Sequence, residues 1–145
     1  MTIRLPLRDL SMAYILNMSY EDYEDIHAED IEELTEDKLY AIHINWLSPS
    51  ALAGLTAKNI TGITDDTYFK EWLSPGQITN INPKAFAALK ESQLLAISYT
   101  NYAGITAEQI SLLSAEKMRA IHIDWLSPSA LAGLTAKNIT GITDD

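Results

Sequence analysis

Carboxylates crowd into one short stretch of this 145-residue sequence. Segment 21–37 reads EDYEDIHAEDIEELTED and holds ten acidic residues with no lysine or arginine. Such a surface attracts basic proteins or divalent cations, and it can also imitate the charge of a nucleic-acid backbone. A solubilising end of the molecule is the alternative interpretation. We take these ten acids as candidate contacts for a basic protein partner: Glu21, Asp22, Glu24, Asp25, Glu29, Asp30, Glu32, Glu33, Glu36 and Asp37.

A second candidate surface is aromatic. Tyr68, Phe69 and Trp72 fall within a single insertion of the sequence pattern described below. An exposed cluster there would anchor a protein or sugar ligand, because large aromatic side chains dominate many interfaces. The alternative is that these rings fill space where the local geometry changes.

The three histidines give a weaker signal for chemistry. His43 and His122 both occur in the context Ile-His-Ile, which favours packing at a corner over a repeated ligand site. His27 lies close to Glu29 and Asp30, where a metal-binding or acid–base role is the less favoured interpretation. The sequence holds no H-x-x-x-H pair and no EF-hand pattern, so we expect no metal site.

Motifs for covalent or cofactor chemistry are absent from the sequence. There is no cysteine, and the patterns G-x-S-x-G, G-x-x-x-x-G-K-[ST] and G-x-G-x-x-G do not occur. We therefore predict a non-enzymatic protein that needs no cofactor. A small enzyme or ligand-binding domain is kept as an alternative.

The net charge of −10 is local. Twenty acidic residues face ten basic ones, and the whole excess lies within 21–37, so the other 128 residues are neutral. This balance argues against direct binding to nucleic acid or to an anionic membrane. No apolar run approaches the roughly 18 residues of a membrane span, and residues 1–17 lack a signal-peptide pattern. We expect a soluble protein, either cytoplasmic or exported without a classical signal.

An internal duplication dominates the organisation of the chain. Residues 41–66 and 120–145 differ at one position in 26, where Asn45 is replaced by Asp124. Fainter matches upstream keep the same offset of 79 residues. After Asp66 the first copy continues into 67–72, whereas the sequence given ends at Asp145. We therefore expect either a longer array or a C-terminal face covered by self-association.

A shorter period of eight residues runs within the duplication. Fourteen such octads can be aligned, starting at Leu10, and their first position is always apolar. The sixth position is apolar or aromatic in all fourteen, and the second is Ser, Thr or Asn in twelve. The frame slips near Trp46, Trp125 and 68–72. The apolar residues are therefore separated alternately by five and three positions. On one long helix this spacing would not keep the apolar residues on a single buried face, so the helix must be interrupted within each octad.

The second octad position indicates where each break falls. Ser, Thr and Asn are preferred helix N-caps, and four of them precede proline, which suits the first helical position. Thr106 with Gln109, and Ser74 with Gln77, have capping-box spacing. Glycine at the eighth position of five octads would supply a left-handed C-terminal turn. These glycines are Gly54, Gly62, Gly104, Gly133 and Gly141.

These signals predict an all-α solenoid of short capped helices, built from octads within a 79-residue super-repeat. Such short helices must stack because they are unstable alone. A compact irregular all-α domain is the alternative, and a β-solenoid is less favoured because it conflicts with the Ser-Pro caps. We expect a single repeat domain over 1–145, with an N-terminal cap (1–9), a first super-repeat (10–88) and a second, incomplete one (89–145).

The octads resemble a known type of bacterial repeat. Segments 55–60 (LTAKNI), 105–110 (ITAEQI) and 113–118 (LSAEKM) resemble the tandem L-[ST]-x-x-[QN]-[IV] repeats of large bacterial secreted, surface or effector proteins. That resemblance implies a spacer or protein-interaction scaffold. An acidic mimic of nucleic acid that binds a basic DNA-binding protein is the alternative function.

Overall fold

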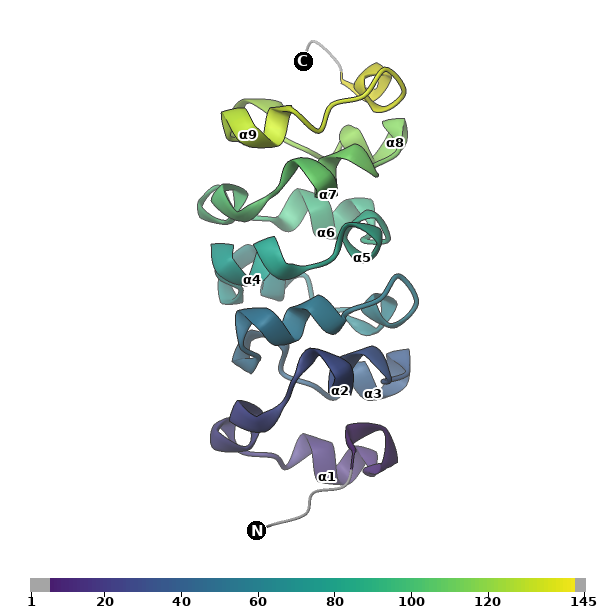
Figure 1. Ribbon diagram of the computed structural model, residues 1–145, viewed down its shortest axis with the longest axis vertical. Coiled ribbons are helices and arrows are strands. Elements are labelled where there is room, and N and C mark those ends of the chain that lie inside the picture. The colour runs from purple at the N-terminus through teal and green to yellow at the C-terminus, as the bar shows by residue number, and fades with distance from the viewer. Residues whose placement is uncertain (1–5, 143–145) are drawn as a thin grey trace.

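The computed structural model describes residues 6–142, in which every regular element is a short helix (Figure 1). No described helix exceeds six residues, and none is long and apolar enough to cross a membrane. The α-helices are α1 (Met12–Leu16), α2 (Ala28–Glu32), α3 (Glu36–Tyr40), α4 (Pro75–Asn80), α5 (Pro83–Ala87), α6 (Glu91–Ala96), α7 (Ala107–Ser111), α8 (Ala115–Met118) and α9 (Pro128–Leu131). The 3-10 helices are η1 (Leu7–Asp9), η2 (Tyr20–Asp25), η3 (Ile44–Trp46), η4 (Pro49–Gly54), η5 (Asn59–Gly62), η7 (Thr100–Gly104), η8 (Ile123–Trp125) and η9 (Asn138–Gly141), and η6 (Tyr68–Trp72) is a π-helix. The prediction of an all-α protein is confirmed, and residues 6–142 include no strand of a β-solenoid.

Side-chain caps begin these helices at the positions that the sequence predicts. The Oγ of Ser74 accepts the N–H of Gln77 at 3.3 Å, and the Oε1 of Gln77 accepts the N–H of Ser74 at 2.8 Å. Thr106 and Gln109 form the same reciprocal pair at 3.2 and 2.9 Å. Proline occupies the first position of η4, α4, α5 and α9. The caps satisfy the exposed ends of helices that are too short to do so internally.

The glycines at the eighth octad position have a different role from the predicted one. No described glycine has a positive φ, so the expectation of left-handed turns is wrong. A Cβ on Gly54 would lie 2.1 Å from the carbonyl oxygen of Ala28, and one on Gly104 would lie 2.0 Å from that of Pro75. Glycine is required at these positions because two backbones that are distant in sequence touch there.

The first and sixth octad positions form a continuous apolar core. Every first-position residue from Leu10 to Leu126, and every sixth-position residue from Ile15 to Met118, is buried. The exceptions lie near the C-terminal end. Leu134, at a first position, is half-buried, and the sixth-position residues Leu131 and Ile139 are 37% and 47% exposed.

Successive passes of the chain lie on one another along the long axis of the molecule (Figure 1). The described ends of the chain are at opposite ends of this axis. Side-chain hydrogen bonds from Asn59, Asn82 and Gln109 reach backbone carbonyls 25 to 31 residues earlier. Neighbouring layers are therefore joined by polar contacts as well as by the apolar core.

Six buried amides make most of these contacts between layers. Each occupies the fifth position of its octad, and together they are the buried polar residues of the described chain. The Nε2 of Gln77 donates to the carbonyls of Asn45 and Leu47 at 3.1 and 2.8 Å, while its Oε1 completes the helix cap. One amide thus closes its own helix and binds the preceding layer. The six residues are Asn59, Gln77, Gln93, Asn101, Gln109 and Asn138.

Candidate functional site

Nine of the ten candidate acids belong to the helices η2, α2 and α3 near the N-terminal end, and Glu33 lies between α2 and α3. Nine of them are exposed, and Asp30 is half-buried. We call this set the acidic surface. Most of these carboxylates are solvated, so they concentrate negative charge on this part of the molecule. Arg8 pairs with Glu33, and Lys38 lies on α3 among the acids.

Structural partners can be named for four of these acids. Asp22 accepts the N–H of Ser19, and Asp30 accepts the N–H of His27, each at 2.9 Å, so both serve as helix caps. The remaining two pair with side chains: Glu33 with Arg8, and Glu36 with the hydroxyl of Thr61. These four carboxylates stabilise the surface on which the other acids are displayed.

The predicted aromatic surface at Tyr68, Phe69 and Trp72 is only partly exposed. Phe69 is fully buried in the core, so its assignment as a contact residue is wrong. The π-helix η6 turns this ring inward, where it fills space as the alternative interpretation expects. Tyr68 is half-buried, whereas Trp72 is 47% exposed. Trp72 remains available to a partner, and its ring meets Tyr68 edge-on at a centroid distance of 5.1 Å.

An aromatic cluster that the sequence analysis did not identify lies beside Trp72. The ring of Trp46 stacks on His43 at 4.1 Å, and it meets Tyr23 and Tyr20 edge-on at 5.2 and 5.8 Å. Edge-to-face and stacked pairs are favourable arrangements of aromatic rings. Packing on three sides holds the Trp46 ring in one place.

Tyr23 also anchors the backbone of this cluster. Its buried hydroxyl accepts the N–H of His43 at 2.9 Å. Burial raises the pKa of the Tyr23 phenol, and the hydrogen bond from His43 partly opposes that rise. His43 therefore has a structural role as a stacking and backbone partner, which agrees with the packing interpretation of the sequence.

The same cluster recurs 79 residues later. His122 stacks on Trp125 at 4.0 Å, and Tyr102 meets Trp125 edge-on at 5.1 Å. The hydroxyl of Tyr102 accepts the N–H of His122 at 2.9 Å, and Tyr99 takes the place of Tyr20. The alignment of Tyr20 with Tyr99, and of Tyr23 with Tyr102, was visible in the sequence. Their contact with the tryptophans was not, because it joins residues from different octads.

A groove of about 460 Å³ opens between the first cluster and Trp72. Rings from η2, η3 and η6 line it together with proline and hydroxyl groups of the neighbouring helix starts. We call it the aromatic groove. Its lining residues are Tyr20, Tyr23, Glu24, Asn45, Trp46, Leu47, Ser48, Pro49, Trp72, Ser74 and Gln77.

The aromatic groove carries negative charge and no positive charge. Glu24 supplies the one carboxylate among the described lining residues, and these include neither lysine nor arginine. Glu24 belongs to η2, whose exposed residues include further members of the acidic surface. The groove and the acidic surface are thus continuous through η2, and together they favour a cationic ligand.

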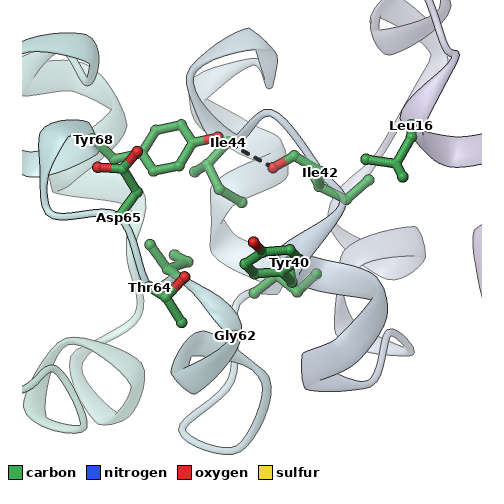
Figure 2. Close-up of a pocket in the computed structure, with 10 residues that line it drawn as sticks. Leu16, Tyr40, Ile42, Ile44, Gly62, Thr64, Asp65 and Tyr68 are labelled. Atoms are coloured by element: carbon green, nitrogen blue, oxygen red, sulfur yellow. Dashed lines mark hydrogen bonds between the residues drawn. The ribbon is translucent and has the colours of Figure 1, made fainter. Parts of the chain in front are cut away.

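A second hollow, of about 270 Å³, lies against α3 and the segment after η5 (Figure 2). The hydroxyl of Tyr68 points toward the carbonyl of Ile42, at 3.5 Å. Hydrogen bonds from Thr67 lower the pKa of Asp65, whereas burial raises that of Tyr68. Both shifts lead away from neutral pH, so these two groups are poorly suited to general acid–base catalysis there.

Within residues 6–142, no group of three His, Asp or Glu side chains is arranged to hold a metal ion. Comparison with known proteins finds no matching family model, no matching curated protein and no matching solved structure.

Proposed function

We propose that this chain is a non-enzymatic solenoid of octapeptide repeats that acts as a scaffold for protein–protein interaction. Its partner is a basic protein, which binds the acidic surface and the adjoining aromatic groove. The continuity of these two features through η2 is the observation that carries the proposal.

The distribution of charge supports a specific surface over general solubility. A chain that needed only solubility would gain as much from acids spread over all layers. Here the excess of ten negative charges lies within 21–37, and the rest of the chain is neutral. A local field of this kind steers a basic partner toward one end of the molecule.

The regular contacts between layers support the architectural part of the proposal. Each layer rests on the preceding one through buried amides such as Gln77 and Gln109, and through close backbone contacts at Gly54 and Gly104. Stability then depends on contacts between neighbours, as in other stacked repeats, and the outer surface is free to vary.

Charge neutralisation on the acidic surface tests the proposal. The variant carries Glu21→Gln, Glu29→Gln, Glu32→Gln and Asp37→Asn, which spares Asp22, Asp30, Glu33 and Glu36 with their structural partners. The control carries Glu71→Gln, Glu91→Gln, Glu108→Gln and Glu116→Gln, four exposed acids outside 21–37. Both sets change the net charge equally, so a difference between them reports position.

We expect the immobilised chain and the control to capture the same basic proteins from a bacterial lysate, and the neutralised variant to lose them. Equal thermal midpoints by circular dichroism would show that the variants remain folded. Equal capture by both variants would contradict the proposal. Release of the captured proteins by double-stranded DNA would favour the alternative function, a mimic of nucleic acid.

Self-association is a second proposal, and it rests on the C-terminal face. Leu131 and Ile139 are partly exposed there, whereas their counterparts Leu52 and Ile60 are fully buried under the following layer. A second copy that packs on this face would bury the same apolar groups. We expect the mass in sedimentation equilibrium to rise with concentration and to stay monomeric for Leu131→Lys. A monomeric mass of the unmodified chain at high concentration would contradict this proposal.

A further inference from the structure

We propose that the aromatic groove binds an arginine side chain of the partner, with the guanidinium over the exposed rings and paired with Glu24. This inference rests on the proposed function, since it assigns one anchor residue to the basic partner. It goes beyond that function by naming the groove as a specific pocket within a broader charged surface.

The groove offers aromatic faces that the fold leaves uncovered. Tyr20 is 61% exposed and Trp72 is 47% exposed, whereas the core residues are almost completely buried. Trp46 is half-buried and is fixed by His43 and Tyr23. A side chain entering the groove therefore meets rings that are already ordered, which lowers the entropic cost of binding.

The charge of the lining selects a cation. Glu24 supplies the carboxylate, and the lining contains no lysine or arginine that would compete with a ligand for it. A cation over the face of tryptophan or tyrosine is attracted by the electrons of the ring, most strongly by tryptophan. Rings and carboxylate thus favour the same ligand at the same place.

The combination of aromatic rings and a carboxylate in the lining favours arginine over lysine. A guanidinium group is planar, so it can stack on an aromatic ring and still present paired donors to a carboxylate. Ser48, Pro49 and Ser74 also line the groove. The two serine hydroxyls accept the N–H groups of Ala51 and Gln77, and each can still donate to the backbone of an extended peptide. The lining therefore combines an anchor for the side chain with polar groups for the chain that carries it.

The second aromatic cluster provides a control within the same molecule. It keeps Tyr99 and Trp125 but has Ala103 at the position of Glu24. Its own acid, Asp124, replaces Asn45 of the first copy. If two aromatic rings and any nearby acid are enough, both clusters will bind the arginine side chain. If a carboxylate at the position of Glu24 is required, only the first cluster will bind it.

Calorimetric titration of the full chain tests the inference. The probe is an end-blocked peptide of sequence RGRGRGR, and its control replaces each arginine by citrulline, which has the same shape without the charge. The chain variants are Tyr20→Ala, Trp72→Ala and Glu24→Gln, with Tyr99→Ala and Glu116→Gln as matched controls at exposed positions. We expect the three groove variants each to weaken binding by about tenfold, as the loss of a cation–π contact or of a charged partner predicts.

The outcomes separate this inference from the proposed function. Binding that is weakened by the groove variants, unaffected by the two controls and lost with citrulline supports the arginine pocket. Binding that survives the groove variants but is lost when Glu21, Glu29, Glu32 and Asp37 are neutralised overturns the pocket and leaves the basic partner standing. Equal losses for Tyr20→Ala and Tyr99→Ala, equal affinity for the citrulline peptide, or no binding by the unmodified chain would each overturn the inference.

Discussion

The side-chain amide of Gln109 donates to the backbone carbonyl of Ile81, 28 residues earlier in the chain, at 2.7 Å. The same nitrogen donates to the carbonyl of Ile78 at 2.7 Å, and the amide oxygen accepts the N–H of Thr106 at 2.9 Å. Gln109 is fully buried, so water cannot replace any of these bonds. One side chain thus begins helix α7 and fixes its distance from the preceding layer.

Replacing Gln109 by methionine should be strongly destabilising. Methionine has a similar length and fits a buried site, but it leaves the carbonyl of Ile81 and the N–H of Thr106 without partners. It also removes one of the two hydrogen bonds that the carbonyl of Ile78 accepts. Because an unsatisfied buried polar group costs about 1–3 kcal/mol, we expect the free energy of unfolding to fall by about 3 kcal/mol. Urea denaturation measures it, and Glu108→Gln on the exposed side of α7 is the control. A loss below that of the control variant would contradict the role of the amide.

Local chemistry explains why much of the fold could be predicted. The caps at Ser74 and Thr106 depend on residues within one turn, and the burial of the first and sixth positions follows from periodicity. Both signals are contained within eight residues, so the sequence displays them directly. The all-α class and the helix starts follow from them.

Contacts between layers explain what could not be predicted. Carbonyl groups about one layer away determine which residues fit at the fifth and eighth octad positions. Gln109 is needed to donate to the carbonyl of Ile81, and Gly54 is needed because a Cβ there would collide with the carbonyl of Ala28. The aromatic groove joins residues of η2, η3 and η6 for the same reason. Only the recurrence of the tyrosines and tryptophans at an offset of 79 hinted at it, and the inward turn of Phe69 carried no local signal.

Replacing two different glycines by alanine should change the stability of the protein in opposite directions. A Cβ added at Gly104 would lie 2.0 Å from the carbonyl oxygen of Pro75, whereas one at Gly76 would meet nothing closer than 3.9 Å. Gly104→Ala forces two backbones apart, and we expect it to cost about 3 kcal/mol of stability or more, like other overpacked sites. Gly76→Ala lies within α4 and should stabilise by about 0.5–1 kcal/mol, because alanine favours the helix. Thermal midpoints check both, and equal shifts for the two variants would contradict a close backbone contact.

The duplicated segment places the same residue, with the same sequence neighbours, in two different structural environments. Leu52 and Leu131 are flanked by the same residues, yet Leu52 is fully buried and Leu131 is 37% exposed. We expect Leu52→Ala to cost about 3 kcal/mol in urea denaturation, as at other core leucines, and Leu131→Ala to cost less than half of that. Equal losses at low protein concentration would mean that Leu131 is also covered, which would contradict the exposed C-terminal face.

Two buried tyrosines make the stability of the fold sensitive to alkaline pH. Burial raises the pKa of Tyr23 and of Tyr102, because the charged phenolate loses its hydration inside the protein. The folded state therefore holds these protons more tightly than the unfolded chain, whose tyrosines titrate near pH 10. Their contribution to stability is fully present below about pH 10 and is lost as the pH rises through the raised folded values.

Replacing both tyrosines by phenylalanine should lower stability at neutral pH and flatten this alkaline loss. Each substitution removes the acceptor for a backbone N–H, of His43 or of His122, which we expect to cost about 1 kcal/mol per site. Without phenols at these positions, the urea midpoint should fall less between pH 9 and pH 11 than in the unmodified chain. Tyr40→Phe, at an exposed tyrosine, is the control and should leave the slope unchanged. An equally steep decline in the double variant would assign the alkaline sensitivity to other groups, because only a group whose proton affinity differs between the two states can tilt that curve.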